Sequence, residues 1–220
     1  MKAVTFSYDD GVTQDIRLVE ILNRYNLKAT FNLNSELLGK DGSLDILGKR
    51  ILHNKVQPHE ITEVYKGHEI AAHTLTHPDM TEMPADEVIR QVEQDRLNLS
   101  ELSGTEVIGM AYPGRQPNYN SRIARIIKNG TGVKYARTTI CNKDFSYQND
   151  LYEFHPSVFH RDWDQLYKLA EKFVELDPKS EKIFYIWSHS YEFDINDEWD
   201  KFEEFCKYIA NRSDIFYGTN

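Results

Sequence analysis

Residues 3–25 read AVTFSYDDGVTQDIRLVEILNRY and join a strand signal to a helix signal. Ala3–Ser7 is a short run rich in β-favouring residues, whereas Asp15–Tyr25 places its apolar residues at helical intervals. The polar residues between the two form a short connecting loop. A strand followed by an amphipathic helix is the repeating unit of parallel α/β proteins, so this segment predicts that class of fold.

The same alternation continues through the rest of the chain. It predicts an α/β single domain over residues 1–220, either a distorted or incomplete (β/α) barrel of about seven strands or an open doubly wound sheet. A less regular segment, roughly residues 35–66, is expected to be an insertion with one or two short helices. The further predicted strands are Ala29–Asn32, Glu69–Ala72, Val107–Tyr112, Val133–Thr138 and Ile183–Trp187, and the further predicted helices are Pro84–Leu102, Ser121–Asn129, Asp164–Leu176 and Glu198–Asn211.

Composition and charge restrict the possible partners. The chain has 220 residues, of which 40% are hydrophobic and 28% charged, and this is sufficient for a buried core. Its formal charge of −9 argues against nucleic acid or an anionic membrane as the main partner, because clustered cations drive binding to phosphates. No apolar run approaches the ~18–20 residues that cross a bilayer.

The N-terminus and the cysteines bear on the cellular compartment. Met1-Lys2 leads directly into the first predicted strand without an apolar signal core, which predicts a cytoplasmic protein, or an extracellular one if a leader has been removed. Cys141 and Cys206 are too few for a disulfide framework, and two free thiols are expected over a single disulfide.

Ionisable residues follow several of the predicted strands. Asp9 and Asp10 follow the first, His73 and His77 the third, and His189 the last. The carboxyl ends of parallel strands meet at one face, so these groups are expected to converge. Taken singly, each has a plainer explanation: an Asp-Asp-Gly surface turn, a chance histidine pair, or a hydrogen-bonded structural histidine. Two histidines four residues apart can bind one metal if their segment forms a helical turn.

Together these groups indicate metal-assisted hydrolysis. Asp10, His73 and His77 would supply two imidazoles and a carboxylate to a divalent metal, most simply zinc, although cobalt, nickel or iron would accept the same ligands. Asp9 is then placed to act as a general base, and His189 could donate a proton to a leaving group. A tight turn with free backbone amides at residues 111–115 could hold an oxyanion.

These residues resemble the motifs of the polysaccharide deacetylases of carbohydrate esterase family 4. The family's T-F-D-D-G, H-[ST]-x-x-H, R-x-P-Y-like and L-x-H motifs occur in that order. The resemblance implies a distorted (β/α) barrel. It also implies that Asp9 is the catalytic base, that His189 is the general acid and that the Gly114 amide binds the oxyanion. The metal ligands that it implies are Asp10, His73 and His77. The matching segments are residues 5–11, 73–77, 111–114 and 186–189.

The chain departs from the family pattern at several positions. Ser7 and Tyr8 stand between Phe6 and the aspartate pair, and Ala111 replaces the arginine that usually holds the base. The candidate replacements for that arginine are Arg115, Arg137 and Arg161. Asp162-Trp163 resembles the family motif whose aspartate tunes the acid histidine, but His155-Pro156 competes for that assignment.

The sequence therefore predicts a metal-dependent hydrolase that removes N- or O-linked acetyl groups from an oligo- or polysaccharide. Metal-bound water is the expected nucleophile, with Asp9 as base and His189 as acid. The aromatic residues Tyr8, Tyr112, Trp187 and Tyr191 suit stacking on sugars, or else core packing.

Three alternatives remain at this point. The first is an iron oxygenase with two histidines and one carboxylate. It is disfavoured because the carboxylate precedes both histidines and because strands alternate with helices. The second is a non-catalytic carbohydrate-binding module on the same fold, and the third is a hydrolase of a non-sugar amide. The sequence does not indicate an oligomeric state.

Overall fold

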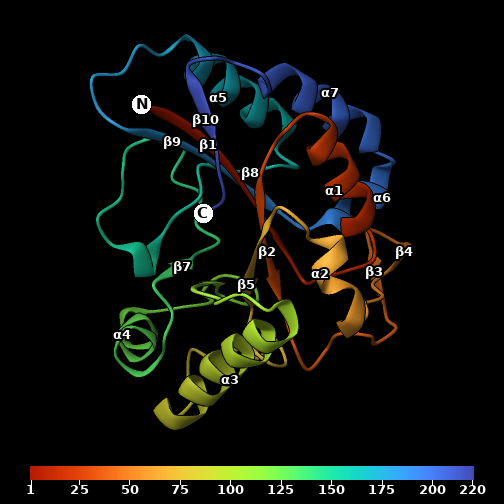
Figure 1. The fold of residues 1–220 in the computed structure, drawn as a ribbon, viewed down its shortest axis with the longest axis vertical. Helices are drawn as coiled ribbons and strands as arrows, with labels where there is room; N and C mark the ends of the chain where they lie inside the picture. Colours follow the sequence, from red (N-terminus) through yellow and green to blue (C-terminus); the bar gives the residue numbers. More distant parts are fainter.

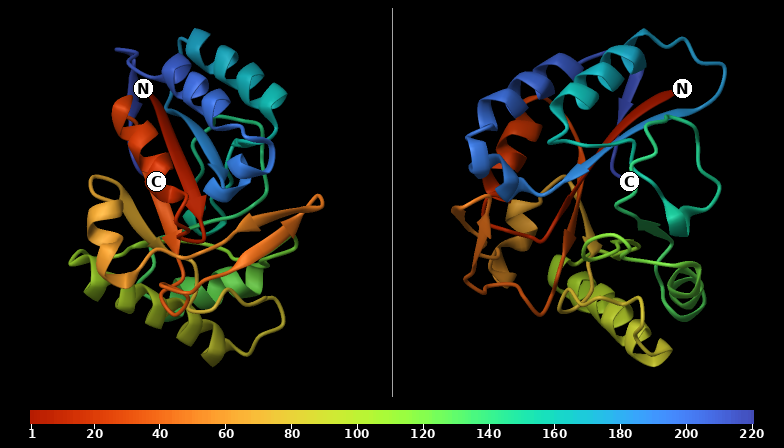
Figure 2. Two further views of the ribbon diagram at one scale, coloured as in Figure 1. Left: turned by 90° about the vertical axis from the view of Figure 1, so that its right-hand side faces the viewer. Right: turned by 180° about the vertical axis from the view of Figure 1, so that it is seen from behind.

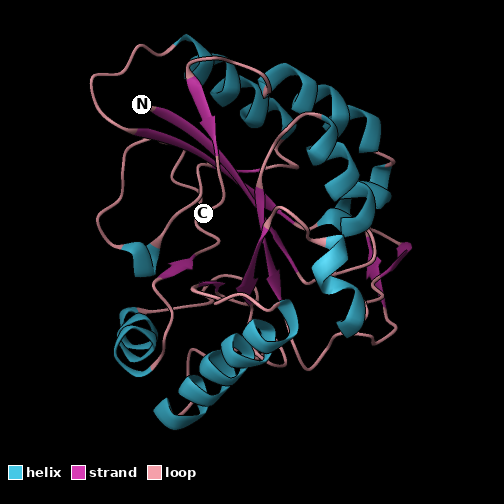
Figure 3. Ribbon diagram, viewed as in Figure 1, coloured by secondary structure: helices cyan, strands magenta, loops and turns pink.

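The computed structural model describes residues 1–220 and contains one large, curled parallel sheet (Figures 1 and 3). The strand order is β7-β6-β5-β2-β1-β9-β8, and β10 pairs with β1 outside this path. The strands are β1 (Lys2–Asp9), β2 (Ala29–Leu33), β5 (Glu69–Ala72), β6 (Gly109–Ala111), β7 (Tyr135–Arg137), β8 (Val158–Phe159), β9 (Lys182–Ser188) and β10 (Ile215–Tyr217).

Helices connect the strands and cover the outside of the curved sheet (Figure 2). Five of them have ten or more residues: α1 (Asp15–Arg24), α3 (Ala85–Ser103), α4 (Ser121–Gly130), α5 (Trp163–Glu175) and α7 (Trp199–Ile209). Their apolar faces join the strands in a core cluster of 44 buried residues. No helix is both long enough and apolar enough to cross a membrane.

The central strand β1 is buried along almost its whole length, with only Ala3 partly exposed. Such continuous burial is typical of a parallel strand that is covered on both faces. On one side β1 pairs with β2, and on the other with β9. The first βα unit of the sequence therefore lies at the centre of the sheet.

The strand order distinguishes between the two expected architectures. From β8 through β9 to β1, β2, β5, β6 and β7, the order follows the chain cyclically and never reverses, as in a (β/α) barrel. In a doubly wound sheet the order would reverse. The two ends of the path, β7 and β8, do not pair with each other, so the sheet is a curled half-barrel. The prediction of a distorted barrel of about seven strands is confirmed.

All six predicted strands and all five predicted long helices are present, with shifts at their ends. Pro84 is the N-cap of α3 and not its first residue. The segment between β2 and β5, where one or two short helices were expected, contains η1 (Pro58–Glu60) and α2 (Ile61–Val64). It also contains an antiparallel hairpin, β3 (Ser43–Ile46) with β4 (Lys49–Leu52), that the sequence analysis did not predict. Both cysteines are free.

Candidate active site

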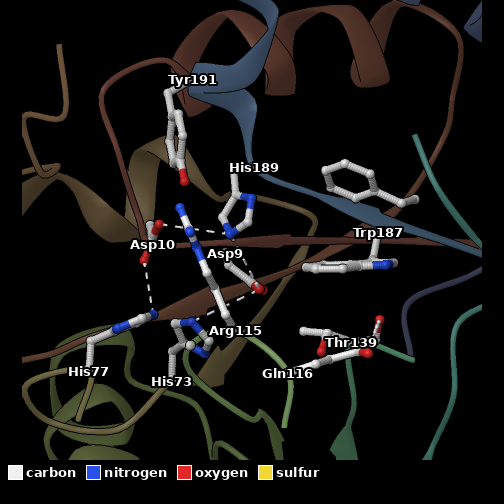
Figure 4. A pocket seen from close by; sticks show the side chains of 12 residues that line it. Asp9, Asp10, His73, His77, Arg115, Gln116, Thr139, Trp187, His189 and Tyr191 are labelled. Atoms are coloured by element: carbon white, nitrogen blue, oxygen red, sulfur yellow. Dashed lines mark hydrogen bonds and ion pairs between the residues drawn. The ribbon is translucent and has the colours of Figure 1, made fainter. Parts of the chain in front are cut away.

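The sheet register brings the predicted site residues to one edge of the sheet. Asp9 at the end of β1 pairs with Asn32 of β2. Tyr8 pairs with Ser188 of β9, so His189 follows at the level of the aspartate pair. Figure 4 shows side chains from these strand ends directed toward one another. The expected convergence of Asp9, Asp10, His73, His77 and His189 is present.

Asp9 is buried and firmly held. The buried Arg137 donates from one guanidinium nitrogen to both carboxylate oxygens of Asp9. Asn32 Nδ2 donates to Oδ1 of Asp9 at 2.8 Å. The arginine also lies over the ring of Trp187, with 4.5 Å between Cζ and the ring centroid. Of the three candidate replacements for the motif arginine, Arg137 is therefore the one that contacts the base.

Asp10, His73 and His77 form a group that can hold a metal ion. One ligand atom from each lies within 4.8 Å of the others. His73 Nδ1 is 2.9 Å from the carbonyl oxygen of Ala111, so Nε2 of that ring is free to face the site. Burial lowers the pKa of His73 to about 4, which keeps its imidazole neutral, as a metal ligand must be. The chemistry and spacing of these donors therefore fit a divalent metal.

The electrostatic surroundings favour an ionised Asp10. Burial by itself would raise the pKa of its carboxyl group, but the nearby cationic and hydrogen-bonding side chains more than offset this effect and hold the pKa well below its usual range. The largest of these effects comes from His53, whose Nε2 lies 3.2 Å from Oδ2. Lys55 Nζ lies 3.6 Å from Oδ1.

The two metal-site histidines meet without a helical turn, the arrangement that the sequence analysis considered for such a pair. Residues 73–77 form a bend in which Thr74 and His77 have positive φ angles of 69° and 58°. The two imidazole rings lie 4.9 Å apart at their centroids. Asp10 also has a positive φ, 84°. Three non-glycine residues at one site thus have positive φ angles, a sparsely populated backbone conformation. Such backbone strain typically occurs at functional sites.

His189 lies across the site from the two histidines and is paired with an acid. Its Nε2 is 4.0 Å from carboxylate oxygens of both Asp9 and Asp10. Its Nδ1 is 3.4 Å from Glu192 Oε2. Burial would lower the pKa of His189, but Glu192 and the two aspartates outweigh it and raise the pKa to about 9. The histidine is therefore protonated at neutral pH, as a general acid must be.

The acid next to His189 is therefore Glu192. The sequence analysis considered Asp162-Trp163 and His155-Pro156 for the motif near this histidine, but neither Asp162 nor His155 contacts it. Asp162 caps helix α5, where its side chain accepts from Gln165 N. His155 Nδ1 lies 2.7 Å from Thr138 Oγ1.

The turn after β6 presents backbone amides to the site. Gly114 lines the cavity with φ 86°, a conformation in which glycine is strongly favoured. The Tyr112 amide donates to the carbonyl of Arg137 at 2.9 Å and is thus already used. The Gly114 amide makes no hydrogen bond within the protein, so it is free to donate to a ligand.

A cavity of about 400 Å³ joins these groups and has an aromatic side. Trp187 and Tyr191, both candidates for sugar stacking, line it together with Phe159. Tyr8 and Tyr112 are fully buried in the core instead. The complete lining is Asp9, Asp10, His73, His77, Gly114, Arg115, Gln116, Thr139, Phe159, Trp187, His189 and Tyr191.

One sequence expectation about the first motif needs correction. The pairing of β1 with β2 and β9 proceeds residue by residue without a bulge. Ser7 and Tyr8 are thus ordinary strand residues and not an insertion between Phe6 and the aspartates. The motif matches simply as Ser7-Tyr8-Asp9-Asp10-Gly11, with serine and tyrosine in the places of threonine and phenylalanine.

The sequence analysis did not identify several residues at the site. Glu192 follows His189 by three residues, and this spacing was a usable signal. His53 and Lys55 belong to the inserted segment and lie more than 40 residues from Asp10, so no local pattern connects them. Asp95 of α3 was also missed: its carboxylate accepts from the backbone amides of His73 and Ser35 at 2.9 and 2.7 Å.

Comparison with known proteins identifies relatives of this chain. It is 27% identical over 107 residues to a bifunctional xylanase/deacetylase of Pseudobutyrivibrio xylanivorans, an alignment that spans 48% of this chain and 15% of the relative. It is 23% identical over 150 residues to a peptidoglycan-N-acetylglucosamine deacetylase of Listeria monocytogenes, with 67% and 28% covered. The alignments thus span less than a third of either relative.

Solved structures share the fold at low sequence identity. A family 4 carbohydrate esterase from Streptomyces lividans, solved in complex with acetate, superposes with a TM-score of 0.56 at 13% identity over 93% of this chain and 86% of that chain. The Streptococcus pyogenes deacetylase PplD, also with acetate, gives a TM-score of 0.54 at 21% identity over 68% and 61%.

The family assignment comes from the sequence match that covers most of the motifs. The family model described as polysaccharide deacetylase matches residues 1–136, more than half of the chain. The matched region contains the aspartate pair, both histidines and the turn at Gly114. The chain therefore belongs to the polysaccharide deacetylase family.

Proposed function

We propose that this protein is a metal-dependent hydrolase that removes acetyl groups from a carbohydrate. The observation that supports this most directly is the meeting of three elements in one cavity. These are a metal-ligand set, a carboxylate held for proton abstraction, and a histidine paired with Glu192 on the other side. A module that only binds sugar has no need of a base and an acid in the same cavity.

The side chains of the cavity suggest a division of labour. A divalent metal held by Asp10, His73 and His77 would supply Lewis-acid polarisation of the acetyl carbonyl and activation of water. Asp9, fixed by Arg137 and Asn32, accepts a proton from the attacking water.

The remaining steps involve the opposite wall and the turn after β6. The free Gly114 amide donates to the oxygen on which negative charge develops. His189 gives its Nε2 proton to the departing nitrogen or oxygen as acetate leaves.

The aromatic wall supports a sugar as the acyl acceptor. Trp187, Phe159 and Tyr191 offer ring faces and edges along the cavity, and such side chains commonly pack against the apolar faces of sugar rings. One curated relative is named a bifunctional xylanase/deacetylase, and another a peptidoglycan-N-acetylglucosamine deacetylase. We therefore propose acetylated xylan, chitooligosaccharides and peptidoglycan fragments as the substrates to test.

The experiment measures acetate release from these three substrates, with and without a chelator. We expect release from at least one substrate, its loss with chelator and its recovery on adding back zinc or cobalt. Asp9→Asn should retain the metal and lose most turnover, whereas His77→Ala should lose stoichiometric metal by elemental analysis. His59→Ala, at an exposed histidine, is the matched control.

Each part of the proposal has a result that would contradict it. No release from any of the three substrates would favour a non-sugar amide or a binding module. Near wild-type turnover by Asp9→Asn would remove Asp9 from its role as base. Full metal retention by His77→Ala would exclude the proposed ligand set.

A further inference from the structure

The inserted segment between β2 and β5 reaches the aspartate turn of the active site. The backbone amide of Val56 donates to the Gly11 carbonyl at 2.9 Å, and the amide of Thr13 donates to the Asn54 carbonyl at 2.8 Å. Lys55 pairs with Val12 in an antiparallel bridge. The chain that follows β4 is thus joined to the loop that follows β1, and the left view of Figure 2 shows the open end of the β3–β4 hairpin near this loop.

Two side chains of this segment contact Asp10 directly. His53 Nε2 lies 3.2 Å from Oδ2 of Asp10. Lys55 Nζ donates to the backbone carbonyl of Asp10 at 2.6 Å and is itself buried. The His53 ring meets the Tyr191 ring edge-on, with centroids 4.9 Å apart and planes at 78°, so its orientation is fixed by packing.

The two carboxylate oxygens of Asp10 have different partners. Oδ1 is the oxygen nearer to the metal-site histidine His77, at 3.8 Å from Nε2. Oδ2 is the oxygen that His53 contacts. Figure 4 shows Asp10 between His77 and His189, with its carboxylate turned into the cavity. Lys55 Nζ lies 3.6 Å from Oδ1, beyond hydrogen-bond distance, so Oδ1 is left for a metal, whereas Oδ2 has a hydrogen-bond donor from the insertion.

We propose that His53 is a positioning residue for the metal ligand Asp10: it donates from Nε2 to Oδ2 and so directs Oδ1 toward His73 and His77. This proposal rests on the proposed function, because it assumes that the three residues bind a metal. Within it, the insertion is part of the metal site and not merely a surface addition.

The backbone of Asp10 explains why such support is needed. Its φ of 84° is unfavourable for a residue with a side chain, and such conformations persist only where the surroundings hold them. Lys55 holds the carbonyl of this residue, and His53 holds its carboxylate. A carboxylate that is already oriented loses less conformational freedom on binding a metal. Partners of metal-ligating groups typically contribute 10–100-fold to metal affinity.

The test compares metal affinity in His53 variants, measured by competition with a chromophoric chelator for zinc and for cobalt. His53→Phe keeps a ring against Tyr191 but has no donor, and we expect it to bind metal on the order of 10–100-fold more weakly than wild type. His53→Gln keeps an amide donor and should recover part of that loss. His59→Phe, at an exposed histidine of the same segment, should bind like wild type.

A second measurement separates positioning from direct ligation and from a general loss of structure. In an Asp10→Ala background, removal of His53 should cost less than twofold in affinity, because its partner is already gone. A full loss in that background would show that His53 acts independently of Asp10 and would overturn the proposal. The visible absorption bands of the cobalt-loaded protein should shift in His53→Phe, whereas a merely structural role would leave them unchanged.

The outcomes also distinguish this inference from the proposed function. If wild type binds metal stoichiometrically and His53→Phe binds within twofold of it, the role of His53 is overturned and the metal site stands. If wild type binds neither zinc nor cobalt, the proposed metal site fails, and the role of His53 fails with it.

Discussion

The substitution of Ala111 for the motif arginine is explained by one pair of residues on adjacent strands. Ala111 of β6 pairs in register with Arg137 of β7. The guanidinium thus comes from the position directly beside the expected one, and it reaches Asp9 from there. Because Arg137 and Asp9 are both buried, removal of either side chain would leave the charge of the other without its partner. A change of motif at one position is compensated by a residue that is distant in sequence and adjacent in the sheet.

Glu192 is the residue whose replacement should change the pH dependence of activity. It lies 3.4 Å from His189 and raises the pKa of that histidine, while its own pKa is lowered to about 2. A general acid is active below its pKa, so activity is lost as pH rises through the value for His189. In Glu192→Gln the negative charge is gone, the pKa of His189 falls, and the alkaline limb of kcat/KM should move to lower pH.

The pH profiles of acetate release by wild type and Glu192→Gln would check this expectation. Glu204→Gln, at an exposed glutamate of α7, is the control and should leave the profile unchanged. An alkaline limb at the same pH in wild type and Glu192→Gln would show that Glu192 does not tune the acid.

At the scale of elements, strands with continuous buried runs could be predicted from sequence, and the partly exposed ones were missed. β1, β2 and β9 are mainly buried, so their apolar runs are visible in the sequence. β6 and β7 have only three residues each but are fully buried, whereas β8 and β10 have a single buried residue each and were not predicted. In the largely exposed β3–β4 hairpin, β3 does alternate polar and apolar residues, a short strand signal that the sequence analysis overlooked, whereas in β4 only Ile51 is buried.

The same distinction applies to the site. Asp10, His73 and His189 directly follow strands, and His77 lies in the loop that begins with His73, so the rule that strand ends converge was enough to group them. Arg137, by contrast, was only one of three candidate arginines, because choosing among them required the β6–β7 register. His53 could not be found at all, since nothing in its surroundings predicts that a hairpin will fold back on the β1 loop.

The packing of β6 against β7 depends on the absence of a side chain at Gly109. A Cβ atom there would overlap the ring of Tyr135, its register partner on β7. The tyrosine cannot turn away freely, because its hydroxyl donates to Glu69 at 2.9 Å. Gly109→Ala should therefore lower the free energy of unfolding by about 1–3 kcal/mol, measured by urea denaturation.

A second variant tests whether the ring of Tyr135 is the cause. Tyr135→Ala removes the obstacle, so adding Gly109→Ala to it should cost much less than the same change in wild type. An equal cost in the two backgrounds would trace the loss to the strand backbone and not to the ring. If Gly109→Ala alone were as stable as wild type, β6 and β7 would have more space between them than their packing indicates.

At the scale of the whole molecule, stability in acid should depend on a histidine in the core. His160 is fully buried, with its ring 4.2 Å from that of Phe193, and its Nε2 atom has no hydrogen-bond partner. Burial lowers the pKa of this imidazole to about 3. The negative charge of Glu192 opposes this shift, and the positive charges of His189 and Arg161 add to it. The ring is therefore neutral in the folded protein at pH values where it would be protonated in the unfolded chain.

The sign of the effect follows from proton binding. Between pH 6.5 and about 3 the unfolded chain binds one more proton at this residue than the folded protein, so the stability that His160 contributes above pH 6.5 is lost as the pH falls through that window. His160→Phe keeps an aromatic ring there and cannot titrate. Its free energy of unfolding, from urea denaturation at a series of pH values, should fall less steeply with acidification than that of wild type. His59→Phe, exposed to solvent, should follow the wild-type curve. Parallel curves for His160→Phe and wild type would mean that the core accepts a charged imidazole, contrary to the burial of this ring among aromatic side chains.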